Sequence, residues 1–214
     1  MNITKYEHAC VVLEKAGSSI VIDPGSYTDD FVMPKLVAAV LITHTHPDHC
    51  DASKIESIIR EFPECRVYAH KDVVKNLQDV ATVQEVTVGE RIDVGDFKVE
   101  FIGGEHAIIH SSIGRIANLG VLIDNGQFYY PGDSFALPTI PIKVLALPVS
   151  APWLKISESI DFLNSVAPQF VFPTHDAILS KKGQDLVDGL CSVMYQREGA
   201  TYQRLNLGEV KIIN

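Results

Sequence analysis

The stretch His44-Thr45-His46-Pro47-Asp48-His49 places three imidazoles and one carboxylate within six residues, directly after the apolar run at 38–43. The chain has 8 histidines in 214 residues. From its composition alone, the pattern His-x-His-x-Asp-His would arise roughly 0.0008 times. The apolar run predicts a buried strand. The sequence therefore predicts a dense polar loop at the end of a strand.

The residue types in this loop are typical of a metal site. Imidazole nitrogens and carboxylate oxygens are the usual protein ligands of Zn²⁺ and similar ions. His44 and His46 are two residues apart, so in an extended stretch their side chains project to the same side. Pro47 turns the chain before Asp48 and His49, which can then point to a neighbouring position. One loop can therefore serve two metal ions.

Length and composition limit the class of protein. With 214 residues, 46% of them hydrophobic and 21% charged, the chain is expected to form one globular domain over residues 1–214. Its 18 basic and 27 acidic residues give a net charge of −9, so a nucleic-acid partner is not expected. The longest apolar run, 36–42, is too short to cross a membrane.

The N-terminus and the cysteines indicate a cytoplasmic protein. The first residues do not have the pattern of a signal peptide. The four cysteines are too widely spaced for a Cys-x-x-Cys motif, so we expect reduced thiols that serve mainly in packing. Cys50, although it follows His49, is included in this expectation.

Hydrophobic patterns predict strands alternating with βα units, which indicates a mixed α/β protein. The predicted strands cover residues 9–14, 18–22, 38–43, 66–69, 83–88, 91–94, 98–102, 118–124, 127–130, 144–147 and 169–172. The predicted helices follow an Asp51 cap up to Pro63, then cover 72–79, a Ser157-capped segment to Ala167, and 182–194. Asn125-Gly126 is typical of a hairpin turn. The tail is expected to pair as strands around Leu207-Gly208.

The loop and its surroundings resemble the metallo-β-lactamase fold superfamily, whose signature is His-x-His-x-Asp-His. Further matches occur in the family's order: His8-Ala9, then IDPG at 22–25, His106 in FIGGEH, Asp133 in YYPGDS and His175 in FPTHD. The resemblance covers nearly the whole chain and points to the small single-domain hydrolases that include ascorbate-6-phosphate lactonase-like proteins. It implies a four-layer αββα sandwich with two mixed sheets face to face, helices outside, and metals at one edge.

The resemblance also implies two metal sites. The first ion would be held by His44, His46 and His106, the second by Asp48, His49 and His175, and Asp133 would bridge both. Each of these residues follows a predicted strand, at the edge where the sites of α/β proteins gather. Asp23 resembles a carboxylate that orients a ligand histidine.

Three further residues have roles that the sequence leaves open. His106 is preferred over His110 as the third histidine of the first site, because the strand before it leads directly into it. His110 would then be a substrate-side or structural residue. His8 is either near the site or structural, and Trp153 either lines the substrate pocket or is a packing aromatic.

The resemblance implies a metal-dependent hydrolase with two divalent ions, Zn²⁺ in preference to Mn²⁺ or iron. A metal-bridging hydroxide would cleave an ester-type bond, and Asp48 would bind metal and orient the hydroxide or accept its proton. Such a centre has a net positive charge, so a small anionic substrate, such as a lactone or a phosphodiester, is expected.

Two alternative functions stay open. The first is an iron-dependent redox enzyme of the same fold, although His46 stands where the di-iron redox branch has a glutamate. The second is a compact nuclease, although the chain is too short for the domain inserted in the nucleic-acid-processing branches. A homo-oligomer is compatible with the sequence.

Overall fold

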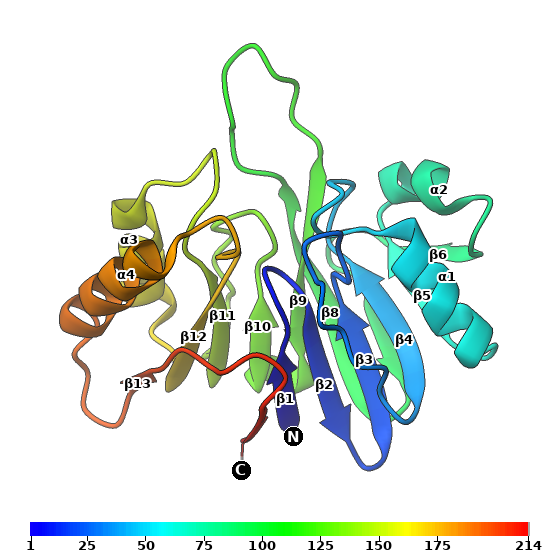
Figure 1. Ribbon diagram of the computed structural model, residues 1–214, viewed down its shortest axis with the longest axis horizontal. Coiled ribbons are helices and arrows are strands. Elements are labelled where there is room, and N and C mark those ends of the chain that lie inside the picture. The colour runs from blue at the N-terminus through cyan, green and yellow to red at the C-terminus, as the bar shows by residue number, and fades with distance from the viewer. Residues whose placement is uncertain (214) are drawn as a thin grey trace.

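Two sheets packed face to face form the centre of the computed structural model, which describes residues 1–213 and in that range has seven strands in each sheet (Figure 1). The first sheet has the order β14-β1-β2-β3-β4-β5-β6. Its strands are β1 (Asn2–Lys5), β2 (Val11–Lys15), β3 (Ser18–Ile22), β4 (Val37–Ile42), β5 (Arg66–Ala69), β6 (Val83–Glu85) and β14 (Val210–Ile212).

The second sheet has the order β13-β12-β11-β10-β9-β8-β7. Its strands are β7 (Arg91–Val94), β8 (Phe97–Glu105), β9 (Ala117–Ile123), β10 (Phe128–Tyr130), β11 (Val144–Pro148), β12 (Phe170–Thr174) and β13 (Thr201–Tyr202). A short 3₁₀ turn, η1 (Asp124–Gly126), connects β9 to β10.

Helices cover the outer faces of both sheets. On one side lie α1 (Ala52–Glu61) and α2 (Lys71–Leu77), and on the other lie α3 (Ile156–Val166) and α4 (Lys181–Met194) (Figure 1). Ile55 and Ile58 of α1 pack with Val40 of β4, and Leu163 of α3 packs with Leu145 of β11. The predicted αββα sandwich is therefore confirmed.

The main core lies between the two sheets. Phe97, Val99 and Phe101 alternate along β8 and face inward, whereas Lys98 between them is exposed. Leu41 of β4 belongs to the same buried cluster from the opposite sheet. This alternation is the signature of a strand with one face on a core, and it fixes which residues of β8 face the other sheet.

The strand directions bring the loops that contain the candidate site residues to one edge. Strands β3, β4, β5 and β6 are parallel to one another, as are β10, β11, β12 and β13. Strand β1 runs in the direction of β3, and β8 runs in the direction of β10, because each is separated from it by one antiparallel neighbour. The loops after β1, β3, β4, β8, β10, β11 and β12 therefore share one edge of the sandwich (Figure 1).

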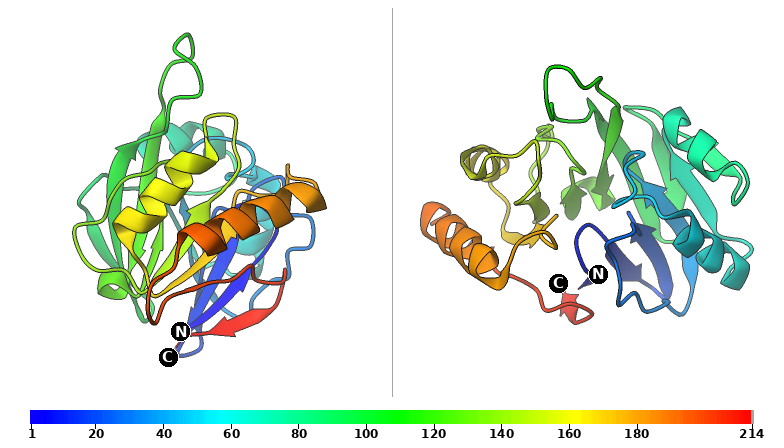
Figure 2. Two further views of the ribbon diagram at one scale, coloured as in Figure 1. Left: turned by 90° about the vertical axis from the view of Figure 1, so that its left-hand side faces the viewer. Right: turned by 45° about the horizontal axis from the view of Figure 1, so that its top comes forward.

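One loop stands out at this edge. The segment between β8 and β9, residues 106–116, projects beyond both sheets (Figures 1 and 2). Ile108 and Ile113 of this segment are about half exposed. None of the helices within residues 1–213 combines the length and the apolar character that a membrane span needs.

Several sequence predictions need correction. The tail does not pair with itself around Leu207-Gly208, because β13 pairs with β12 and β14 pairs with β1. Helix α3 begins at Ile156 rather than after a Ser157 cap, and Glu158 accepts a hydrogen bond from the backbone N–H of Lys155. Strand β8 continues to Glu105, beyond the predicted end at residue 102. Strand β1 was not predicted.

Candidate metal centre

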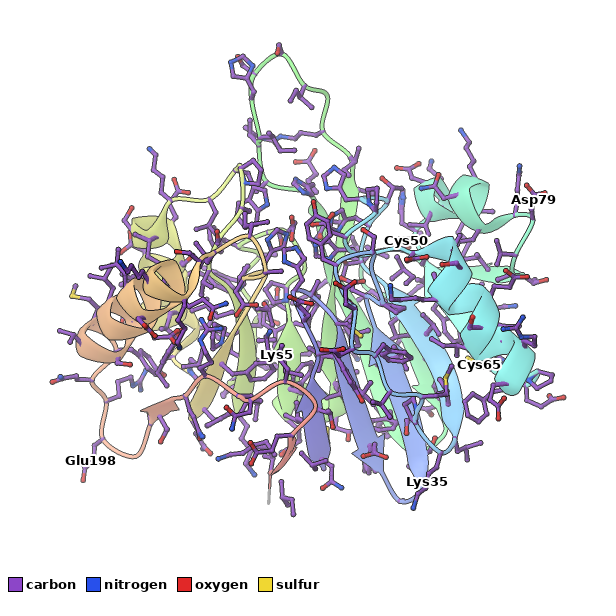
Figure 3. The ribbon with its side chains drawn as sticks, viewed as in Figure 1. Lys5, Lys35, Cys50, Cys65, Asp79 and Glu198 are labelled. Carbon is purple, nitrogen blue, oxygen red and sulfur yellow. The ribbon has the colours of Figure 1, made fainter. Side chains whose placement is uncertain are left out.

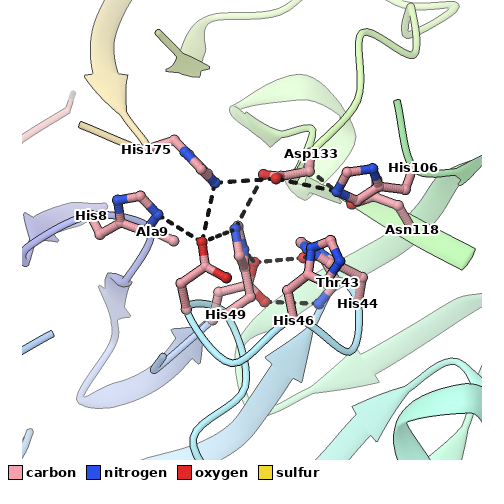
Figure 4. A network of polar contacts seen from close by, with 12 residues as sticks. His8, Ala9, Thr43, His44, His46, His49, His106, Asn118, Asp133 and His175 are labelled. Atoms are coloured by element: carbon pink, nitrogen blue, oxygen red, sulfur yellow. Dashed lines mark hydrogen bonds and ion pairs between the residues drawn. The ribbon is translucent and has the colours of Figure 1, made fainter. Parts of the chain in front are cut away.

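Histidines and carboxylates from both sheets converge at the shared edge (Figure 4). His44, His46, Asp48 and His49 follow β4, whereas His106, Asp133 and His175 follow β8, β10 and β12 of the other sheet. Together with His8, they form two groups of four in which the candidate ligand atoms lie within 4.8 Å of one another, and Asp23, His44 and His49 form a third, smaller group. One group is His44, His46, His106 and Asp133, and the other is His8, Asp48, His49 and His175.

Asp133 lies between the two groups. Its Oδ2 is 3.3 Å from Nε2 of His106 in the first group and 3.1 Å from Nε2 of His175 in the second. Its Oδ1 is 3.1 Å from Nε2 of His49. Asp133 is therefore the one carboxylate among these seven residues whose oxygens together contact histidines of both groups.

The hydrogen bonds of His106 and His175 determine which ring nitrogen has the proton and which has the lone pair. Nδ1 of His106 lies 2.6 Å from the carbonyl oxygen of Ala107, and Nδ1 of His175 lies 2.5 Å from that of Ser150. A carbonyl oxygen only accepts, so each Nδ1 has the proton. The lone pair of each neutral ring is then on Nε2, which faces the cluster.

Asp23 also determines which ring nitrogen has the proton in two further histidines, one from each group. Its Oδ2 accepts from Nδ1 of His49 at 2.7 Å and from the hydroxyl of Thr43 at 2.6 Å. Since the Thr43 hydroxyl gives its proton to Asp23, its oxygen accepts from Nδ1 of His44, 2.9 Å away. Both rings therefore turn Nε2 toward the cluster.

The unpartnered atoms of this cluster test whether a metal ion fits. Within residues 1–213, the buried side-chain atoms without a hydrogen-bond partner are Nε2 of His49, His106 and His175 and Oδ1 of Asp133. A buried polar atom that lacks a partner costs about 1–3 kcal/mol. All four are donor atoms that divalent metal ions bind, and all lie in one place. The residues present therefore fit a metal centre.

Burial and mutual contact shift the pKa values of the cluster. Burial and the neighbouring His49 hold the pKa of His44 well below its ordinary value. Burial also opposes the charged form of His175, but Asp133 and Asp48 outweigh it and raise its pKa to about 9. For Asp133, the histidines His49 and His175 outweigh burial and lower the pKa. Opposed shifts within one small cluster are typical of a functional site.

His8 lies inside this network, but its hydrogen bonds give it a different role from the other histidines. The backbone N–H of Ala177 donates to its Nδ1 at 3.3 Å, so the proton of the neutral ring is on Nε2. Burial lowers the pKa of His8 to about 4, so the ring is neutral near pH 7. Its Nε2–H therefore donates to Oδ2 of Asp48, 3.0 Å away, and orients that carboxylate.

Trp153 and Asn118 hold Asp133 in place. The indole N–H of Trp153 donates to Oδ2 of Asp133 at 2.8 Å, and both side chains are buried. Oδ1 of Asn118 accepts from the backbone N–H of Asp133 at 2.9 Å. Trp153 thus contacts the site as well as packing against Phe135. The sequence analysis missed Asn118, because nothing in its neighbourhood distinguishes it from an ordinary residue of a strand.

His110 lies outside the cluster. It is exposed on the projecting segment, and its Nδ1 is 2.7 Å from the hydroxyl of Ser112. His106, by contrast, is 3% exposed and lies in the first group. The arrangement brings together His106 and the other six expected ligands and leaves His110 in solvent.

Gly25 explains how the metal-binding loop is supported. A Cβ at this position would overlap the backbone carbonyl group of Asp48. The two segments are also paired by backbone hydrogen bonds, from Ser26 to Pro47 at 2.8 Å and from Asp51 to Pro24 at 3.2 Å. The absence of a side chain at position 25 therefore lets the segment after β3 lie directly against the loop that contains Asp48 and His49.

A cavity of about 220 Å³ opens onto the cluster. Its lining combines polar groups of the site with apolar side chains: His8, Tyr27, His46, Asp48, Ile109, Asp133, Pro152, Trp153, His175 and Ile178. Larger hollows lie at other parts of the surface, for example beside the Gly17 turn between β2 and β3. They contain no comparable group of convergent donors among the described residues, so we assign the site by its chemistry rather than its size.

Comparison with known proteins identifies the family of this chain. The model of the Beta-lactamase superfamily domain matches residues 2–175, and the chain belongs to this family. It is 32% identical to Protein Rv0786c of Mycobacterium tuberculosis over 91% of this chain and 92% of that protein.

Solved structures share the fold at lower identity. Igni18, a metallo hydrolase from Ignicoccus hospitalis, has a TM-score of 0.75 and 18% identity, over 98% of this chain and 97% of that chain. CmlA, a diiron β-hydroxylase from Streptomyces venezuelae, has a TM-score of 0.77 and 16% identity, over 99% of this chain and 54% of that chain. The fold therefore occurs in proteins described as hydrolases and in one described as a hydroxylase.

Proposed function

We propose that this protein is a metal-dependent hydrolase that uses two divalent ions, Zn²⁺ in preference to Mn²⁺ or iron, to cleave an ester-type bond in a small molecule. The observation that supports it best is the group of four unpartnered donor atoms buried at one edge. The first ion would be held by His44, His46 and His106, the second by Asp48, His49 and His175, with Asp133 shared between them.

Divalent ions bound by these residues would lower the pKa of a water molecule and polarise a carbonyl or phosphoryl oxygen. The protein's own groups orient the ligands. Asp23, Ala107 and Ser150 hold protons on the Nδ1 atoms of the histidines, so that Nε2 stays a donor. Trp153 holds Oδ2 of Asp133.

Asp48 is the residue that we assign to proton transfer. Its side chain is 20% exposed and lines the cavity, unlike the almost fully buried Asp133. Its Oδ2 accepts the hydrogen bond from His8, which leaves Oδ1 to orient a water molecule or to accept its proton.

The test is turnover of a panel of small lactones, carboxylic esters and phosphodiesters by zinc-loaded, manganese-loaded and metal-stripped protein. We expect hydrolysis of at least one ester class that disappears on metal removal and returns on addition of Zn²⁺ or Mn²⁺. Asp48→Asn should retain the metal ions more fully than His106→Ala and should lower kcat by about 10²–10⁴-fold. A coloured, iron-containing protein that consumes dioxygen and cleaves no ester would contradict the proposal and favour the redox alternative.

A further inference from the structure

The cavity that opens onto the candidate metal centre has an apolar part beside the polar cluster. Tyr27, Ile109, Pro152, Trp153 and Ile178 form its sides. Tyr27 and Ile178 are 47% and 53% exposed, although both are large apolar residues beside a polar cluster. Exposed apolar side chains that gather at one place commonly mark a binding surface.

A second, smaller hollow of about 80 Å³ continues the apolar surface under the projecting segment. His46 and Ile109 line both hollows, so they adjoin at the metal centre. Ile108, Ile113 and Ile116 add further apolar surface to the smaller one. The 106–116 segment thus extends the wall of the site outward with isoleucine side chains.

Cationic side chains are scarce around these hollows. Among the described residues that line them, there is no lysine, and the one arginine is Arg115. Its guanidinium is paired with the carboxylate of Glu105. Away from the histidines and the ions they would hold, an anionic substituent of a substrate would therefore meet no lysine and no unpaired arginine, while an apolar one would meet five apolar side chains.

We infer that the site takes an uncharged substrate whose non-reacting part is an apolar group of about one ring, such as a phenyl ring or a branched alkyl chain. This inference rests on the proposed function for the reacting bond and differs from the anionic substrate expected from sequence. A cavity of about 150 Å³ holds a benzene molecule in a protein core, so the 220 Å³ here accommodates one ring beside the reacting group.

The test compares two esters that share their reacting group and chain length. Methyl 3-phenylpropanoate has a phenyl ring where monomethyl succinate has a carboxylate. For the metal-loaded protein, we expect kcat/KM for the phenyl ester to be at least about 10-fold higher, since apolar pockets discriminate by this order. Equal values, or a preference for the succinate ester, would overturn the inference.

Substitutions of the isoleucines that line the cavity test whether these side chains cause the preference for the phenyl ester. Ile109→Ala and Ile178→Ala should each lower kcat/KM for the phenyl ester by about 10-fold and change that for the succinate ester by less than about twofold. Val193→Ala, at a 66% exposed position on α4, serves as the matched control and should change neither. Equal losses for both esters in the isoleucine variants would contradict a role in recognition.

Binding measurements separate this inference from the hydrolase proposal. The chain has 1 tryptophan, Trp153, and it lines the cavity, so its fluorescence reports occupancy. We expect 3-phenylpropanamide to bind at least about 10-fold more tightly than succinamate. If neither ester is cleaved but this difference is found, the hydrolase proposal fails and the pocket inference stands; equal binding overturns the pocket inference whatever the turnover.

Discussion

At the scale of single residues, the position of the proton on each histidine ring decides which nitrogen can bind a metal ion. Backbone carbonyls fix His106 and His175, and Asp23 fixes His49 directly and His44 through the Thr43 hydroxyl. His8 has the opposite tautomer because Ala177 donates to it. Histidines that look alike in the sequence thus differ in which ring nitrogen faces the cluster, because of partners that the sequence does not indicate.

Asp23→Asn tests the orienting carboxylate. The amide nitrogen cannot accept from Nδ1 of His49, and a single amide oxygen cannot replace both carboxylate oxygens toward Thr43 and His49. We expect metal affinity to fall about 10–100-fold, measured by competition with a chelator of known affinity. Asp51→Asn, which alters the cap of α1 and the ion pair with Lys54, is the control and should leave metal affinity unchanged.

Gly25→Ala tests the close approach of the two loops. The added methyl group would overlap the backbone of Asp48, so the loop must move and displace His49. We expect the variant to bind less metal per chain than the wild type and to unfold more easily. Gly189→Ala is the matched control, because a Cβ there meets nothing within 4 Å and alanine favours a helix by about 1 kcal/mol. Full metal content in Gly25→Ala would show that the loop tolerates the displacement.

At the scale of elements, patterns in the sequence predicted most of the strands and helices, because their apolar faces repeat with the period of the element. The Asp51 cap of α1 and the buried run of β4 are examples. Strand β1 could not be predicted, because its buried Lys5 depends on Asp176, 171 residues away. The partners of β13 and β14 were predicted wrongly for the same reason, since pairing between distant segments leaves no local signal.

Lys5 lies in the interior of the molecule (Figure 3). Its pairing with Asp176 links the two sheets. Nζ of Lys5 lies 3.0 Å from Oδ1 of Asp176, and the two side chains are 1% and 5% exposed. Arg204 also pairs with Asp176 and reaches Asp188 of α4. The network thus joins β1 of one sheet to the end of β12 and to α4 of the other.

Asp176→Asn should destabilise the metal-free protein by about 3–5 kcal/mol, because Lys5 would remain buried without its partner charge. Urea unfolding at pH 7 measures this. The control Asp93→Asn removes the ion pair with Lys98, whose side chains are 74% and 67% exposed. It should lower the free energy of unfolding by less than about 1 kcal/mol. Similar losses in the two variants would contradict the importance of the buried pair.

The contribution of the Lys5–Asp176 pair to the stability of the fold depends on pH. Burial raises the pKa of Asp176, but Lys5 and Arg204 outweigh it and hold the pKa below its ordinary value in the folded state. A lowered carboxyl pKa stabilises the fold above the unfolded-state value of about 3.9, and this contribution is lost as the pH falls through the folded-state pKa. The stability difference between wild type and Asp176→Asn should therefore be constant near neutral pH and shrink below about pH 4.

At the scale of the whole molecule, the metal centre joins the two halves of the sandwich. His44, His46, Asp48 and His49 belong to the loop after β4 of the first sheet, while His106, Asp133 and His175 belong to the second. The resemblance to a known fold placed these seven residues together before any coordinates. The apolar cavity walls were only partly anticipated: Trp153 was considered, but Tyr27 and Ile178 lie in segments without a recognisable motif.

Removal of metal should lower the thermal stability of the whole protein. Ligand bound only by the folded state, at about 1,000 times its Kd, adds about 4 kcal/mol. For a chain of this size that corresponds to roughly 10 °C in Tm. Calorimetry of metal-loaded and chelator-treated protein measures the shift, and an unchanged Tm would contradict a metal centre that links the two sheets.

The most direct test of the central claim is the metal content of the purified, untagged protein by elemental analysis, for wild type, His106→Ala and His110→Ala. We expect about two divalent ions per chain in the wild type and in His110→Ala, and a clear loss in His106→Ala. Absence of metal from the wild type after incubation with Zn²⁺ or Mn²⁺, or equal metal content in all three proteins, would contradict the assignment of the buried histidine and aspartate cluster as a two-metal site.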